Sequence, residues 1–252
     1  MKLKELLKQG HAYGTMLSEL YVPNIMRVFK ACGFDYVIID CEHGYFDFTE
    51  VANLLSVARG YDLPTLIRLS KTDREFVLKY LDMGANGFLL SNTDTPEQIA
   101  ELVRLSKYLP EGRRGISLQR AHTDYEPGEI KEYLLQANRD TVILAQIESS
   151  KAVANSREIA AVSGVDGMMI GPNDLALDMN MLGENDAPEI AAAYEDVIGA
   201  FREAGKYCGL ISSNIAFLKK WESKGMQLLN WNSEIGMLLN EGKRGVGGLK
   251  GK

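Results

Sequence analysis

Short apolar runs alternate with longer amphipathic segments along almost the whole chain, and this alternation constrains the fold more than any other feature. Eight runs are predicted strands, near 12–17, 36–40, 64–69, 87–91, 141–147, 167–171, 206–212 and 226–231. Segments with helical spacing of apolar residues lie between them, such as 47–60, 73–84, 95–107, 151–162 and 187–204. Strands that are apolar on both faces are typical of parallel sheets covered by helices. The sequence therefore predicts an α/β fold, a closed (β/α)8 barrel.

The length of 252 residues fits one such barrel better than two smaller domains. We expect a single domain over residues 1–252, opened by a short docking helix. Residues 241–252 are rich in Gly and Lys and predict a flexible tail. Residues 109–138 exceed the usual length of a connection and predict a structured excursion over one mouth of the barrel.

Composition argues against several classes of partner. The net charge is −6, and the chain has no basic stripe interleaved with aromatic residues, so a nucleic-acid partner is not expected. The apolar runs are too short to cross a bilayer. Three widely spaced cysteines fit neither a disulfide framework nor a zinc motif, so we expect a reducing cytoplasm.

Ionisable residues follow three of the predicted strands. Asp40-Cys41-Glu42-His43 follows the second run, Gln146-Ile147-Glu148 ends the fifth, and Gly171-Pro172-Asn173-Asp174 follows the sixth. Barrel enzymes place their catalytic residues at the carboxyl ends of the strands. The sequence therefore predicts that these groups meet at one mouth of the barrel and perform metal-assisted acid/base chemistry.

Glu148 and Asp174 are the predicted metal ligands. A buried carboxylate needs a compensating partner, and a divalent cation can compensate two carboxylates at once. Gln146 faces the same side of its strand as Glu148. A site made of oxygen ligands suits Mg²⁺ or Mn²⁺ better than Zn²⁺. The alternative is that both carboxylates only cap the turns that follow their strands.

His43 and Arg68 are the remaining chemical candidates. His43 is the only histidine at a strand end, which favours proton transfer over a purely structural role; Asp40, Glu42 and Asp82 are available partners. Arg68 interrupts an apolar strand, so it requires an anion, either a substrate carboxylate or enolate or one of the nearby acids. The predicted strands carry no interior-facing lysine, so a Schiff-base mechanism lacks its nucleophile.

Taken with three further motifs, these residues resemble the class II pyruvate aldolases of the HpcH/HpaI family, which includes 4-hydroxy-2-oxo-heptanedioate and 2-dehydro-3-deoxyglucarate aldolases. The further motifs are Gly33-Phe34-Asp35, Leu81-Asp82-Met83-Gly84-Ala85 and Pro110-Glu111-Gly112-Arg113-Arg114-Gly115. The resemblance covers roughly residues 5–240. It implies a barrel of the phosphoenolpyruvate/pyruvate type, whose last helix packs on a partner subunit and whose dimers assemble into a homohexamer.

The resemblance also implies roles for individual residues. Glu148 and Asp174 would bind Mg²⁺ or Mn²⁺, His43 would be the base held by Asp82, and Arg68 would stabilise the enolate oxygen. Further implied roles are the binding of the pyruvate carboxylate by Gln146 and the backbone of Asn173 and Asp174, and a place for Asp40 near a subunit boundary, close to a neighbouring site. The implied reaction is the reversible cleavage of 4-hydroxy-2-oxo acids to pyruvate and an aldehyde through a metal-stabilised enolate.

Two positions depart from the family pattern. Ser91-Asn92 stands where the family usually has Pro-Met, and Asn232-Ser233-Glu234 stands where it usually has Gly-Ser-Asp. Neither departure replaces a predicted ligand, but both alter the mouth of the pocket. Two other functions stay open: a citrate-lyase-like enzyme acting on an acyl-CoA ester, and a barrel that binds oxo acids without catalysis.

Overall fold

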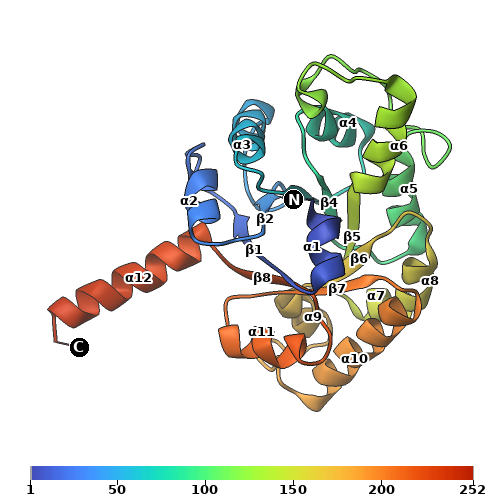
Figure 1. Cartoon of the computed structure of the whole chain (residues 1–252). Helices are drawn as coiled ribbons and strands as arrows, with labels where there is room; N and C mark the ends of the chain where they lie inside the picture. The colour runs from blue at the N-terminus through green and yellow to red at the C-terminus, as the bar shows by residue number, and fades with distance from the viewer. Residues whose placement is uncertain (1, 252) are drawn as a thin grey trace.

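A computed structural model describes residues 2–251 and shows a closed barrel of eight parallel strands (Figure 1). Each strand pairs with the next in sequence, and β8 closes the barrel against β1. The strands are β1 (Ala12–Leu17), β2 (Tyr36–Asp40), β3 (Thr65–Leu69), β4 (Gly87–Leu90), β5 (Val142–Ile147), β6 (Gly167–Ile170), β7 (Tyr207–Ser212) and β8 (Leu228–Ser233). The predicted (β/α)8 fold is confirmed. Of the predicted single domain, only the end residues Met1 and Lys252 lie outside the described part.

Helices surround the barrel, and several begin at a side chain that caps the first turn. Asp47 accepts a hydrogen bond from the Glu50 backbone N–H at 2.8 Å, and Asp73 accepts one from Glu75 at 2.8 Å. The helices are α1 (Leu3–Gln9), α2 (Ile25–Ala31), α3 (Phe48–Gly60), α4 (Arg74–Asp82), α5 (Pro96–Ser106), η1 (Ala121–Thr123), α6 (Ile130–Asp140), α7 (Ser150–Ala154), α8 (Ser156–Ala161), α9 (Pro172–Asp178), α10 (Pro188–Glu203), α11 (Ile215–Glu222) and α12 (Glu234–Leu249).

Two apolar cores hold the barrel together. The larger core fills the layer between the strands and the surrounding helices, and a smaller one fills the inside of the barrel with residues such as Ile38, Leu66 and Leu144. Polar residues at the carboxyl ends of the strands therefore rest on a packed floor. Within residues 2–251, no helix is long and apolar enough to cross a membrane.

The excursion predicted over residues 109–138 lies on the amino-end side of the barrel beside α4, whereas α1 packs Leu3 and Leu7 on the inner core at that mouth (Figure 1). Helices α3 and α4 finish at that end, and the excursion is tied to them by ion pairs of Asp124 with Arg59 (2.7 Å) and of Arg114 with Asp82 (3.0 Å). Its last part is helix α6, which leads into β5. The excursion therefore lies opposite the strand ends that carry the predicted catalytic groups.

The last helix, α12, differs from the sequence prediction. Residues 241–249 were predicted as part of a flexible tail, but they continue this helix, which projects away from the barrel (Figure 1). Glycines make this segment a poor helix former on propensity alone. Within the helix, Glu241 pairs with Arg244 one turn later at 2.5 Å.

Candidate active site

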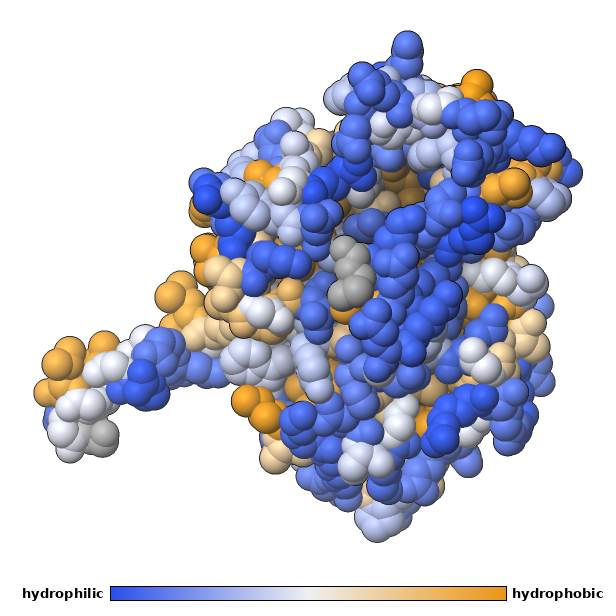
Figure 2. Space-filling view, in the orientation of Figure 1, coloured by the Kyte–Doolittle hydropathy of each residue, from blue (hydrophilic) through white to orange (hydrophobic). Residues whose placement is uncertain are grey.

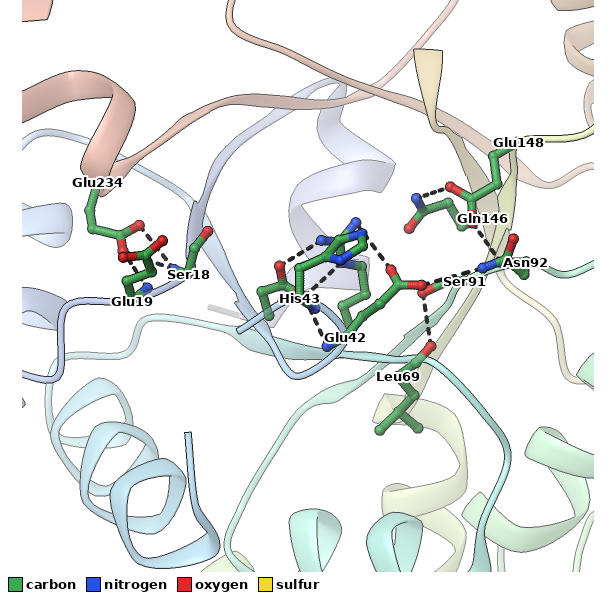
Figure 3. Close-up of polar contacts among 12 residues, drawn as sticks. Ser18, Glu19, Glu42, His43, Leu69, Ser91, Asn92, Gln146, Glu148 and Glu234 are labelled. Atoms are coloured by element: carbon green, nitrogen blue, oxygen red, sulfur yellow. Dashed lines mark hydrogen bonds and ion pairs between the residues drawn. The ribbon is translucent and has the colours of Figure 1, made fainter. Parts of the chain in front are cut away.

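Polar side chains gather at the carboxyl ends of β2 to β6, as the sequence predicted. In Figure 3, His43 and Glu42 lie on one side of this space and Gln146 and Glu148 on the other; Asn92 lies beside Glu148 and is joined by a dashed line to Glu42. Glu42 and His43 follow β2, Asn92 follows β4 and Glu148 follows β5, whereas Gln146 lies within the last residues of β5. Neighbouring parallel strands thus bring together groups that are far apart in sequence.

A buried ion pair between Arg68 and Asp40 forms one wall. The two residues are direct neighbours in the pairing of β2 with β3. Arg68 donates from Nε to Oδ1 at 2.9 Å and from Nη2 to Oδ2 at 2.6 Å, and its Nη1 lies 3.4 Å from Glu42 Oε2. Asp40 is 2% exposed and Arg68 8%. Both acids that the sequence offered as partners of Arg68 therefore face it.

Asp40 also shapes the turn that presents His43. Its Oδ1 accepts hydrogen bonds from the backbone N–H groups of Glu42 (3.0 Å) and His43 (3.2 Å). Burial alone would raise the pKa of Asp40, but the hydrogen bonds and charge of Arg68 outweigh burial and lower it. Within its own chain, the buried Asp40 side chain is held by Arg68 and by this turn. Its place near a subunit boundary, which the resemblance implies, stays a prediction.

Replacing Asp40 with Asn should destabilise the protein by about 3 kcal/mol at pH 7, because a buried guanidinium loses its charged partner. Because the pKa of Asp40 is lowered in the folded state, its contribution is present at neutral pH and is lost as the pH falls through that lowered value. Urea denaturation at pH 7 and at acidic pH measures both effects. The control is Asp186→Asn, which breaks an exposed pair with Lys220 and should cost less than about 1 kcal/mol. Equal losses in the two variants would contradict the assignment.

Glu148 forms the opposite wall, directly after β5. Its side chain is 4% exposed; one carboxylate oxygen accepts a 2.6 Å hydrogen bond from the Asn92 backbone N–H, and the other accepts from the side-chain amide of Gln146. Burial raises the pKa of Glu148 to about 7, and the charges of Glu42 and Asp174 add to this effect. A Cβ on Gly171 would lie 2.5 Å from Glu148 Oε2, so only glycine leaves room for the carboxylate.

Asp174 lies in the first turn of α9, directly after β6, and its side chain is exposed. The backbone N–H groups of Asn173 and Asp174 are in the same turn, where a helix supplies no acceptor of its own. Within residues 2–251, no group of three or more His, Cys, Asp or Glu side chains is arranged to hold a metal ion. The charge of Asp174 nevertheless reaches Glu148, since it contributes to the raised pKa of that carboxylate.

The donor set around Glu148 fits a hard divalent cation. The Gln146 side-chain oxygen is buried and has no hydrogen-bond partner among the described residues. Carboxylate and amide oxygens are the protein ligands that Mg²⁺ and Mn²⁺ prefer, and both ions keep positions for water and substrate. The predicted roles of Glu148 and Asp174 as metal ligands stay a prediction that this set of oxygens supports.

The predicted pair of His43 with Asp82 does not form within the chain. Asp82 is the last residue of α4, a helix that starts beyond the carboxyl end of β3 and runs back to the opposite mouth. There Asp82 accepts a hydrogen bond from Arg114 and lies 3.6 Å from His122 Nε2. The side chain of His43 is exposed and has no hydrogen-bond or ion-pair partner within the described chain.

The two segments that depart from the family pattern, Ser91-Asn92 and Asn232-Ser233-Glu234, both have structural roles. Asn92 adopts a left-handed backbone (φ +47°), a conformation for which Asn is enriched. Glu234, 4% exposed, accepts hydrogen bonds from three successive backbone N–H groups, those of Ser18 (2.9 Å), Glu19 (2.7 Å) and Leu20 (3.1 Å). This nest ties the start of α12 to the loop after β1 (Figure 3). An Asn directly after a strand, a residue type enriched in left-handed turns, is the one sequence signal that could have pointed to Asn92.

Comparisons with known proteins agree with this geometry. A family model described as HpcH/HpaI aldolase/citrate lyase matches residues 15–240. A 5-keto-4-deoxy-D-glucarate aldolase from Klebsiella pneumoniae is 31% identical over 85% of this chain and 83% of the relative. A hydroxypyruvate/pyruvate aldolase from Roseovarius nubinhibens is 31% identical over 86% of this chain and 84% of the relative. The crystal structure of an HpcH/HpaI aldolase from Desulfitobacterium hafniense matches with a TM-score of 0.96 and 35% identity, over 99% of this chain and 97% of that one.

Proposed function

Because the chain belongs to the HpcH/HpaI aldolase/citrate lyase family and is a carbon–carbon lyase, we propose that it is a class II aldolase that depends on Mg²⁺ or Mn²⁺. Its reaction would be the reversible cleavage of 4-hydroxy-2-oxo acids to an aldehyde and pyruvate or a close 2-oxo acid. The name of the Roseovarius relative, a hydroxypyruvate/pyruvate aldolase, supports a 2-oxo acid as one half of the substrate. The observation that carries the proposal is the buried Glu148 carboxylate, whose pKa is raised by burial and by the charges of Glu42 and Asp174.

Glu148 and Asp174 would hold the cation, with the side-chain oxygen of Gln146 close by. When bound, the cation supplies positive charge that acidifies the C–H bonds beside the ketone of a 2-oxo acid. Burial of Glu148 strengthens its interaction with such a charge, because water does not screen it there. A carboxylate with a raised pKa gains most from a cationic partner.

The other roles belong to side chains that the structure already holds in place. Arg68, fixed by Asp40, would stabilise the negative charge that develops on the ketone oxygen. His43, on the turn after β2, would accept a proton from the methyl carbon in the synthetic direction and return it after cleavage. The carboxylate of the substrate would be oriented by Gln146 and by the free N–H groups of Asn173 and Asp174.

The surface of α12 supports the further proposal that a second copy of the chain covers this helix; the assembly of such dimers into a hexamer rests on the resemblance alone. The helix projects from the barrel and bears apolar groups at its far end (Figures 1 and 2). Leu238, Leu239, Val246 and Leu249 are 50% exposed or more. Exposed apolar patches of this kind mark sites of protein–protein contact.

The three cysteines support the proposal of a reducing compartment such as the cytoplasm. Cys32, Cys41 and Cys208 are all free thiols. Burial raises the pKa of Cys208 to about 12 and that of Cys41 to about 11, which makes both thiols poor nucleophiles.

Exchange of pyruvate methyl protons for deuterium tests the proposal without knowledge of the aldehyde. We expect exchange in D₂O, followed by NMR, when Mg²⁺ or Mn²⁺ is present, and none after treatment with a chelator. Exchange that persists in the chelator, or that neither cation supports, would refute the proposal. Binding of pyruvate without exchange would favour a non-catalytic barrel, and cleavage of an acyl-CoA ester would favour the citrate-lyase branch that the family name includes.

A further inference from the structure

Asn92 contacts both walls of the candidate site at once. Its backbone N–H donates to Glu148 Oε1 at 2.6 Å, and its side-chain Nδ2 donates to Glu42 Oε1 at 3.3 Å (Figure 3). Its carbonyl oxygen accepts a hydrogen bond from Gln98 Nε2 at 3.2 Å, which ties the residue to the first turn of α5. Three of the four polar groups of Asn92 are thus in use, and two of them serve carboxylates of the site.

The left-handed backbone of Asn92 accompanies the first of these contacts. At φ +47° the chain turns sharply after β4, and the N–H of Asn92 is directed at Glu148. Most side chains are strained in this conformation, because the Cβ atom approaches the following carbonyl oxygen, whereas Gly and Asn adopt it readily. The identity of residue 92 therefore bears on the position of Glu148 even though the contact is made by the backbone.

The side chain of Asn92 acts on the other wall. Glu42 also lies 3.4 Å from Arg68 Nη1, and it is the sequence neighbour of His43. Glu42 and Glu148 are like charges that face the same space, and each receives a hydrogen bond from the neutral Asn92. A neutral group that donates to two carboxylates offsets their repulsion and fixes their separation.

We propose that Asn92 is a positioning residue: its backbone holds Glu148, and its side-chain amide holds the turn that carries Glu42 and His43. This inference rests on the proposed function, because it takes Glu148 as a metal ligand and His43 as the base. It divides the two tasks between separable parts of one residue. The backbone contact should govern cation binding, and the side-chain contact should govern proton transfer.

Two substitutions separate these tasks. Asn92→Gly keeps the left-handed backbone and its N–H but removes the amide, so Mn²⁺ affinity should stay within about twofold of the parent. In the same variant, kcat for pyruvate exchange should fall about tenfold at nearly unchanged KM, the lower end of the effect of losing a supporting residue. Asn92→Ala also disfavours the left-handed backbone, so its Mn²⁺ affinity should fall about tenfold as well. Electron paramagnetic resonance of free Mn²⁺ measures affinity, and NMR measures exchange.

Asp62→Ala is the matched control. Asp62 also has a left-handed backbone (φ +49°), but it lies between α3 and β3 at the opposite mouth and is exposed. Its substitution should lower thermal stability, as in Asn92→Ala, without changing Mn²⁺ affinity or exchange. A shared loss of stability is therefore distinguished from an effect on the site.

The outcomes separate this inference from the proposed function. If the parent protein binds Mn²⁺ and exchanges pyruvate protons but Asn92→Gly matches it in kcat, the positioning role of the side chain is refuted. If Asn92→Ala keeps full Mn²⁺ affinity, the role of the backbone is refuted. A parent protein that neither binds Mn²⁺ nor catalyses exchange overturns the proposed function, and this inference with it.

Discussion

Replacing Glu148 with Gln is expected to abolish cation-dependent exchange of pyruvate protons and cleavage of 4-hydroxy-2-oxo acids. The substitution keeps the shape of the side chain but removes the charge that would face the cation. Mn²⁺ affinity should fall more than about 100-fold, beyond the loss seen when a residue that only supports a ligand is removed. Glu148→Ala should lose activity to the same extent. Undiminished activity of either variant in a metal-free assay would contradict the assignment of Glu148.

The same substitution should stabilise the metal-free protein at alkaline pH. Burial raises the pKa of Glu148 from its ordinary 4.5 to about 7, so the folded state holds this proton more tightly than the unfolded state. Stability of the parent protein should therefore decline as the pH rises from about 4.5 to about 7, by on the order of 3 kcal/mol. Glu148→Gln lacks this decline, and rotation of the Gln146 amide lets its unpaired oxygen accept a hydrogen bond from the new amide.

Urea denaturation at pH 5 and pH 8, in the presence of a chelator, tests whether stability declines with rising pH in the parent protein and not in the variant. Above pH 7 the variant should be the more stable protein without metal, and Mn²⁺ should stabilise the parent alone. The same dependence on pH in both proteins would show that Glu148 is not the group responsible. Stabilisation of both proteins by Mn²⁺ would place the cation elsewhere.

Replacing Gly171 with Ala should disrupt the site while it leaves the barrel folded. The added Cβ would lie 2.5 Å from Glu148 Oε2 and 3.0 Å from Gln146 Nε2, so at least one of these groups must move. The backbone of Gly171 (φ −94°) is accessible to alanine, so the effect comes from contact and not from strain. We expect Mn²⁺ affinity to fall at least about tenfold and exchange to be lost with it.

Gly199→Ala is the control for this experiment. Gly199 lies within α10, and a Cβ there would have no heavy atom within 4 Å. Alanine at this position should stabilise the protein by about 0.5–1 kcal/mol through its helix propensity and leave exchange unchanged. If Gly171→Ala retains the Mn²⁺ affinity of the Gly199 variant, the space beside Glu148 is not needed for the site.

The barrel could be predicted because its signals are local. Each predicted strand overlaps an observed one, and Asp40, Glu148 and Asp174 lie at the carboxyl ends because they end or closely follow those strands. Asp82 ends a helix that returns the chain to the other mouth, so its predicted contact with His43 is not made within one chain. The last turns of α12 were not predicted, because their glycines have low helix propensity.

The sequence by itself determined which segments form strands, which faces they bury and which mouth of the barrel receives the ionisable groups. Only the tertiary structure decided which groups hold each other: Arg68 with Asp40, Asn92 with Glu148 at a separation of 56 residues, and Glu234 with the Ser18 N–H at a separation of 216. The physical reason is that periodicity records the direction of burial within a few residues. A hydrogen bond requires a donor–acceptor distance that is correct to within a few tenths of an ångström. Here the donors and acceptors lie in loops that only barrel closure brings together.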